Sequence, residues 1–141
     1  MGATGGRGRL CLTCAYETCE CDGLTSHELT KRGKILTVNA ERAANRWVRA
    51  EFVREWRTEF SLLARGMPRF RWVSVTALPF QQRGRLQDVG ACLPAVKAAI
   101  DGLVDRGVVP DDDARYVRSI VFHPPRRGDN GLTLVVTGPE D

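Results

Sequence analysis

Lys97 and the aspartates that follow it are the residues whose types and spacing best suit chemistry in this sequence. Asp101 comes four residues after Lys97, and Asp111, Asp112 and Asp113 form a consecutive run shortly afterwards. Clustered carboxylates repel one another unless a cation neutralises them, and magnesium prefers such hard oxygen ligands. With a lysine nearby in a basic chain, the pattern indicates a magnesium site that faces phosphate.

The same residues also have a purely structural interpretation, which the sequence leaves open. A run such as Asp111–Asp113 is common in solvated turns, and Lys97 also suits the surface of a helix. Asp101 and Asp105 lie on the polar side of the same predicted helix, where charged residues are expected. For these two aspartates we favour the structural interpretation.

The composition predicts one globular domain with unevenly distributed charge. The chain has 141 residues, 43% of them hydrophobic, and a formal net charge of +4, so it is long enough to bury a core. Residues 1–87 carry a net charge of +7 and residues 88–141 a net charge of −3. This asymmetry is typical of a protein that attracts a polyanion and acts on it with a metal. An unevenly charged solvated surface produces the same pattern.

No segment has the composition of a membrane span or of a secretory signal. A run of roughly 18 apolar residues is absent from the sequence. Residues 1–9 are rich in glycine and basic, and they lack an apolar core. We therefore expect no membrane association and a cytoplasmic location, where disulfides are rare.

The periodicity of apolar residues predicts an α/β (α+β) fold in the order β-α-β-α-β-β, with helices packed on a mixed sheet. Pro94 suits the first turn of the second helix, because it needs no hydrogen-bond donor there. A Gly-Asp-Asn-Gly turn separates the last two strands. The predicted elements are a strand at 34–39, a helix at 40–64, a strand at 69–80, a helix from Pro94 to Val104, and strands at 116–122 and 132–136.

Residues 1–33 are predicted to be an appendage to a main domain at 34–141. Its cysteines follow the spacing C-x2-C-x4-C-x-C, and His27 comes six residues later. Four soft ligands in a reducing compartment predict a zinc knuckle held by four thiolates, or by three with His27. A tail with incidental thiols and a redox site are the alternatives. The candidate zinc ligands are Cys11, Cys14, Cys19 and Cys21. The isolated Cys92 is expected to be a small packed residue.

The lysine and aspartate motif of the main domain, without the cysteines, resembles the RusA family of crossover-junction endodeoxyribonucleases, which resolve Holliday junctions. The resemblance covers roughly residues 34–137 and implies a homodimer that binds four-way DNA junctions and cuts symmetric strands with Mg²⁺. Many members are phage-borne, which implies the host cell cytoplasm for such a protein. The residues that carry the resemblance are Val38-Asn39, Lys97-x-x-x-Asp101-x-Leu103 and Asp111-Asp112.

The resemblance also implies roles for individual residues. The positions of the family's first two aspartates hold Ala91 and Leu93, and the nearest carboxylate is Asp88, three residues from the expected place. Three residues are close to one helical turn, so we expect Asp88 to reach the same metal from the end of the strand. The segment Asp88-Val-Gly-Ala-Cys92 resembles a variant branch of the family. We expect catalysis by Asp88, Lys97 and Asp112, and Mg²⁺ binding by Asp88, Asp111 and Asp112. Two alternatives are a relative that binds junctions without cutting them and a small phage adaptor that contacts a protein.

Arginines are the expected contacts to DNA phosphates. Ordinary surface charge is the alternative for any one of them. The candidates are Arg42, Arg46 and Arg49 in the first predicted helix and Arg83 and Arg85 in the loop after the second predicted strand. Trp47, Trp56 and Trp72 are expected to be core residues rather than base-stacking platforms.

Overall fold

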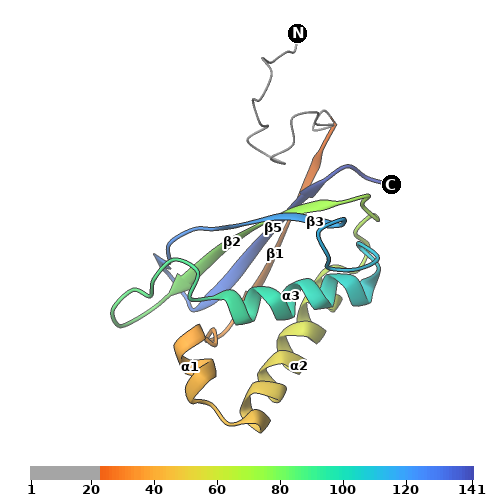
Figure 1. Cartoon of the computed structure of the whole chain (residues 1–141). Helices are drawn as coiled ribbons and strands as arrows, with labels where there is room; N and C mark the ends of the chain where they lie inside the picture. Colours follow the sequence, from red (N-terminus) through yellow and green to blue (C-terminus); the bar gives the residue numbers. More distant parts are fainter. Residues whose placement is uncertain (1–22) are drawn as a thin grey trace.

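A mixed five-stranded sheet forms the frame of the described part of this computed structural model, residues 23–141 (Figure 1). The predicted α+β class, with one domain and helices packed on a mixed sheet, is confirmed. The elements are β1 (Thr25–Arg32), α1 (Val38–Ala43), α2 (Arg46–Leu63), β2 (Val73–Gln81), α3 (Leu93–Arg106), β3 (Val117–Phe122), β4 (Arg126–Arg127) and β5 (Gly131–Gly138).

The strand order of the sheet determines where each end of α3 lies. The strands follow the order β1-β5-β2-β3, and the short β4 also pairs with β2. Strand β5 is antiparallel to β1 and to β2, whereas β3 is parallel to β2. A parallel connection requires the helix between the strands to run back along the sheet. The start of α3 therefore lies near the end of β2, and its end lies near the start of β3.

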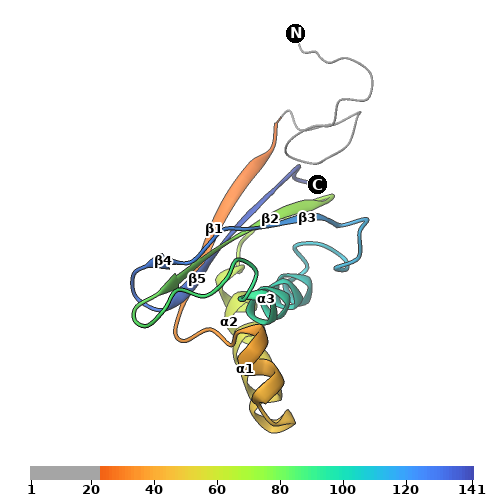
Figure 2. The same cartoon turned by 60° about the vertical axis from the view of Figure 1, so that its left-hand side comes forward.

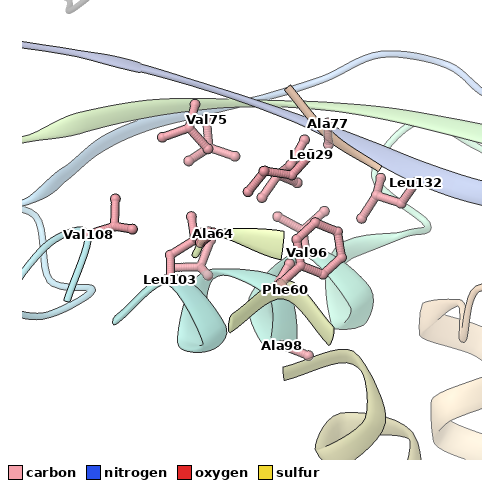
Figure 3. Close-up of a cluster of buried hydrophobic side chains, with 14 of the residues drawn as sticks. Leu29, Phe60, Ala64, Val75, Ala77, Val96, Ala98, Leu103, Val108 and Leu132 are labelled. Carbon is pink, nitrogen blue, oxygen red and sulfur yellow. The ribbon is translucent and has the colours of Figure 1, made fainter. Parts of the chain in front are cut away.

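Helices α2 and α3 cover the same face of the sheet (Figure 2). Phe60, Val96 and Leu103 from these helices pack against Val75 and Leu132 from the sheet, and all five are buried (Figure 3). None of the helices in residues 23–141 is long and apolar enough to span a membrane.

The close approach of the two helices requires a glycine in α3. A Cβ atom built on Gly102 would lie 2.4 Å from the carbonyl oxygen of Arg57 and 2.9 Å from the amide nitrogen of Ser61. Both contacts are shorter than real Cβ atoms make. Gly102 therefore brings the polar edges of α2 and α3 together, and this contact positions the charged residues described below.

The predicted strand at 34–39 is wrong. Thr37 instead caps α1, and its hydroxyl oxygen accepts a hydrogen bond from the amide of Ala40 at 3.2 Å.

The first strand is β1, which lies inside the predicted 1–33 appendage and pairs with β5 along its whole length. Burial alternates along β1, but the alternation of hydrophobic residues is weak, because its two buried residues are Leu29 and the charged Lys31. Glu55 compensates this buried charge, with its carboxylate 2.9 Å from the lysine nitrogen.

The predicted helix at 40–64 is divided into α1 and α2. The side chain of Asn45 accepts a hydrogen bond from the amide of Val48 at 2.9 Å and begins α2 as its N-cap. Asparagine competes with the helix backbone in this way, which is why it favours caps over helix interiors. The second predicted helix and the last two predicted strands are confirmed by α3, β3 and β5, within a few residues at their ends.

Candidate functional site

Helix α3 separates the carboxylates that the sequence placed in one magnesium site. Asp88 precedes its first residue, while Asp111 and Asp112 follow its last. The helix has 14 residues, which corresponds to about 21 Å at 1.5 Å per residue. No group of three or more His, Cys, Asp or Glu residues that could hold a metal occurs in residues 23–141. One chain therefore does not assemble the expected set of Asp88, Asp111 and Asp112.

The C-terminal half of α3 brings a different carboxylate close to Asp112. Partial burial raises the pKa of Asp101, and the negative charges of Asp112 and Asp105 raise it further, whereas Arg57 and Lys97 lower it. The charge of Asp112, in the segment after α3, therefore acts on the polar side of this helix. Asp101, which we expected to be an ordinary surface charge, belongs to the electrostatic environment of Asp112.

Other acidic residues at this end of α3 already have partners. Arg57 binds the Asp105 carboxylate through two hydrogen bonds of 2.5 and 2.7 Å and lowers the pKa of Asp105. Arg115 binds Asp113 in the same two-point manner and lowers its pKa. Asp101 and Asp112 are the two carboxylates of this cluster whose side chains make no hydrogen bond or ion pair in the described residues.

Lys97 lies one helical turn before Asp101 on the exposed side of α3. Residues four apart on a helix are neighbours on its surface, and the charge of Lys97 lowers the pKa of Asp101. Its ammonium group makes no ion pair within residues 23–141. Lys97 is therefore available to bind an anion beside the two unpaired carboxylates.

The donor atoms of Asp101 and Asp112 fit magnesium. This ion takes hard oxygen ligands, keeps several waters, and is commonly bound by one or two carboxylates together with substrate phosphate. Asp101 and Asp112, which carry like charges, supply two carboxylates and meet that minimal requirement. Asp111 is a weaker candidate, because one of its carboxylate oxygens already accepts a hydrogen bond from the amide of Asp112 at 2.8 Å.

Asp88 lies in a separate cavity of about 640 Å³ at the opposite end of α3. The chain before α1, the end of β2, the loop at 82–92 and the turn before β5 surround this cavity, and two basic side chains, Lys34 and Arg83, line it with Asp88. Gln81 fixes the loop, since its side-chain amide donates to the carbonyl oxygens of Arg83 and Arg85, each at 2.7 Å. This arrangement is a mixed-charge cavity with a single carboxylate.

The five expected DNA-contacting arginines fall into two groups. Arg83 and Arg85 are exposed in the loop beside Asp88, whereas Arg42, Arg46 and Arg49 lie where α1 meets α2. The carbonyl oxygen of Glu41 accepts a hydrogen bond from Arg49 at 3.3 Å, which connects the two helices. The two groups therefore come from different elements of the fold, the loop at 82–92 and the corner between α1 and α2.

The expectation that all three tryptophans are core residues is wrong for one of them. Trp56 and Trp72 are 1% and 3% exposed, but Trp47 is 72% exposed. Trp47 is the second residue of α2, next to the capped helix start, so its side chain lies beyond the region where α2 meets the sheet. In the sequence, Trp47 lies outside the helically spaced apolar residues that begin at Val48, and this position was a sign that its side chain is exposed.

The candidate zinc ligands Cys11, Cys14, Cys19 and Cys21 lie outside the described residues. His27, the alternative ligand, packs edge-on against Phe70 with ring centroids 5.8 Å apart. Cys92 is buried, as expected, and burial raises the pKa of its thiol to about 11. It is therefore a packing residue and not a nucleophile at neutral pH.

Two functional candidates were missed by the sequence analysis. Arg57 connects the basic side of α2 to the acidic cluster, and Lys34 lines the Asp88 cavity. The periodicity of the first predicted helix placed Arg57 on a polar face, but nothing in the sequence indicated that this face meets Asp105. Lys34 was assigned to a strand that does not form.

Comparisons with known proteins do not identify a family. No family model and no curated protein matches the sequence. Among solved structures, the chain is similar to a thiamine-monophosphate kinase from Stenotrophomonas maltophilia K279a, with 14% sequence identity and a TM-score of 0.35. The alignment covers 87% of this chain and 33% of the kinase, so the chain spans about a third of that protein's length.

Proposed function

We propose that this protein is a RusA-like, Mg²⁺-dependent endonuclease that cuts branched DNA, with four-way junctions as its substrate. The observation that carries the proposal is that the charges of Asp112 and of Lys97, one helical turn before Asp101, both act on the Asp101 carboxylate of α3. Two carboxylates beside a lysine, none of them ion-paired within residues 23–141, match what phosphodiester cleavage requires, namely a cation site next to a phosphate contact.

Each residue of this surface has a distinct task in the proposed reaction. Magnesium, when bound, would supply a more acidic water and neutralise charge on the phosphate. Asp101 and Asp112 would hold the ion, and the Lys97 ammonium would donate hydrogen bonds to a phosphate oxygen as negative charge develops there. The Arg57–Asp105 pair keeps Arg57 beside Asp101, so it limits the repulsion between the carboxylates.

A homodimer would give Asp88 a place in the same reaction. In a two-fold dimer, a surface at one end of α3 can contact the opposite end of the second copy, and the reverse contact follows by symmetry. Such a contact would bring Asp88 of the second copy to Asp101 and Asp112 and create two equivalent sites. Two equivalent sites are what paired, symmetric cuts in a four-way junction need.

A cleavage assay with matched binding measurements tests the proposal. A mobile four-way junction incubated with the protein and Mg²⁺ should receive paired symmetric nicks, whereas a linear duplex of the same length should stay intact. Asp112→Asn should abolish the nicks and keep junction binding. Asp129→Asn, an exposed carboxylate in the turn before β5, is the matched control and should cut normally. Cleavage by Asp112→Asn at the wild-type rate would contradict the proposed site.

The second candidate function is junction binding without cleavage. The separation of Asp88 from Asp111 and Asp112 by the length of α3 favours it, because a monomer then holds only two of the expected carboxylates. Tight, salt-sensitive junction binding without nicks at any Mg²⁺ concentration would support this function over the enzyme.

A further inference from the structure

The most exposed aromatic side chain in residues 23–141 lies in a basic environment. Trp47, at 72% exposure, exceeds every other large hydrophobic residue of the described chain, and its neighbour Val48 is 49% exposed. The Arg46 guanidinium lies over the indole, 5.1 Å from the ring centroid. Burying a tryptophan gains much free energy, and tryptophan is enriched at interfaces, where one end of its side chain is apolar and the other is wet.

The position of Trp47 in the fold makes it accessible to a large partner. The turn between α1 and α2 projects away from the sheet in both views of the molecule (Figures 1 and 2). The Asn45 cap and the hydrogen bond from Arg49 to the Glu41 carbonyl connect the two helices at this corner. The indole is therefore presented at a hydrogen-bonded corner, and such local order lowers the entropic cost of binding.

A stripe of arginines runs from this corner along α2. Arg46, Arg49 and Arg57 lie on one side of the helix by its 3.6-residue period, and they span about 16 Å. Arg49, Arg54 and Arg57 line a shallow hollow of about 520 Å³ with Glu41, Ala50 and Val53. The first turn of α2 contains no acidic residue. Arginine side chains spaced along a helix complement the phosphates of a nucleic acid backbone.

The arginine stripe ends at the acidic cluster. Arg57, its last member, is the residue that binds Asp105 beside Asp101. A nucleic acid strand that follows the stripe from the corner would therefore reach the carboxylates and Lys97. The charge of the stripe suits a polyanion, and the indole suits a flat apolar surface. An unstacked nucleobase offers that surface together with the phosphate charge.

We propose that Trp47 stacks on an unstacked base at the branch point of the DNA, while arginines of α2 other than Arg57, which is bound to Asp105, bind the adjacent phosphates. This inference rests on the proposed function, because it names the part of a branched substrate that this corner recognises. Arg46 would stay against the indole and extend the stacking surface through its guanidinium plane. The indole would thereby distinguish branched DNA, whose bases unstack at the branch, from an intact duplex.

The test compares binding to three DNA molecules without Mg²⁺, so that cleavage does not enter. The ligands are a four-way junction, a linear duplex of equal length and a single strand, each measured by fluorescence anisotropy at several salt concentrations. We expect Trp47→Ala to weaken binding to the junction and to the single strand by between about 5-fold and about 100-fold. Duplex affinity should stay unchanged, and Trp47→Phe should keep most of the junction affinity.

Leu62→Ala is the matched control, because Leu62 is an exposed apolar residue at the other end of α2. It should bind all three ligands as the wild type does. A junction with 2-aminopurine at the branch point gives a second readout that a general loss of stability would not mimic. Stacking on Trp47 should quench that fluorophore with wild-type protein and not with Trp47→Ala at saturating protein.

Two different failures can be told apart. Wild-type junction affinity in Trp47→Ala, or an equal loss for junction and duplex, would overturn the stacking inference and leave the proposed nuclease intact. Absence of DNA binding by the wild-type protein would overturn both, and Trp47 would then belong to a protein-contacting surface.

Discussion

Arg57 and Asp105 join α2 to α3 through two parallel hydrogen bonds, from Nε to Oδ2 at 2.5 Å and from Nη2 to Oδ1 at 2.7 Å. The pair crosses the contact that Gly102 permits, and it places a guanidinium beside Asp101. It therefore links the stability of the helix pair to the electrostatics of the candidate site. The effect on stability and the effect on the candidate site can be measured separately, with variants of Asp105 and of Asp101.

Asp105→Asn should lower stability by up to about 1 kcal/mol at pH 7, because both partners are well exposed and water screens their attraction. Arg57 holds the pKa of Asp105 below its usual value, so the carboxylate stabilises the fold above its unfolded pKa of about 3.9. That stability is lost as the pH falls through the lower pKa of the folded state. Urea unfolding of wild type and variant between pH 7 and pH 2 should therefore give curves that converge at acidic pH. A stability difference that does not change with pH would contradict the assignment.

Asp101→Asn should raise stability slightly at neutral pH and reduce cleavage by at least about 100-fold. Burial and the charges of Asp112 and Asp105 raise the pKa of Asp101, so ionising it opposes folding. The amide removes that cost and also removes a ligand of the proposed ion. Thermal unfolding measured with increasing Mg²⁺ separates the two effects: the wild type should gain stability as the ion binds, and the variant should not. An equal gain in both proteins would place the ion elsewhere.

The fold was predictable from the sequence where the hydrophobic pattern is strong. Helix α3 was found because its apolar residues recur at helical spacing and Pro94 starts it. The first strand was missed because the buried side of β1 includes Lys31, whose charge Glu55 compensates from α2. The ion pair between Lys31 and Glu55, which are distant in the sequence, allows a charged residue at a buried position of the strand. The local sequence pattern does not indicate such a contact.

The candidate site was predictable in its residue types but not in its grouping. Lys97, Asp111 and Asp112 were selected for their charge and spacing, and Asp88 was added because a shift of three residues is near one helical turn. That reasoning holds on a continuous helix, whereas Asp88 lies in the loop before α3. Asp101 was set aside as a surface charge because the sequence does not show that the charge of Asp112, after α3, acts on it.

Gly102→Ala should destabilise the protein by roughly 1–3 kcal/mol, the range for overpacking. In an exposed helix the same change stabilises by about 1 kcal/mol, because alanine is the better helix former. Here the added methyl group would overlap the backbone of α2 at Arg57 and Ser61. Chemical denaturation with circular dichroism as the readout measures the sign of the change directly. A more stable variant would show that the helices are not in close contact at this position.

Mixing two inactive variants should restore partial activity if Asp88 acts on the second copy of a homodimer. Neither Asp88→Asn nor Asp112→Asn should cut a four-way junction alone. In a mixed dimer, one site combines both lesions, whereas the other combines the intact Asp88 of one copy with the intact Asp112 of its partner. We therefore expect single-strand nicks after subunit exchange, from about a quarter of the number of intact sites in the wild type, because about half of the dimers are mixed and each has one intact site of two. A denaturing gel with each junction strand labelled in turn detects them.

The unmixed variants and a mixture of each variant with Asp101→Asn complete this experiment. Asp101 and Asp112 lie at the same end of α3, so Asp112→Asn mixed with Asp101→Asn should stay inactive, because every mixed site then carries one lesion. Asp88→Asn mixed with Asp101→Asn should recover nicks for the same geometric reason as the first pair. Recovery in both mixtures, or in neither, would contradict a site shared between the two ends of α3. Normal cutting by Asp88→Asn alone would remove Asp88 from the reaction.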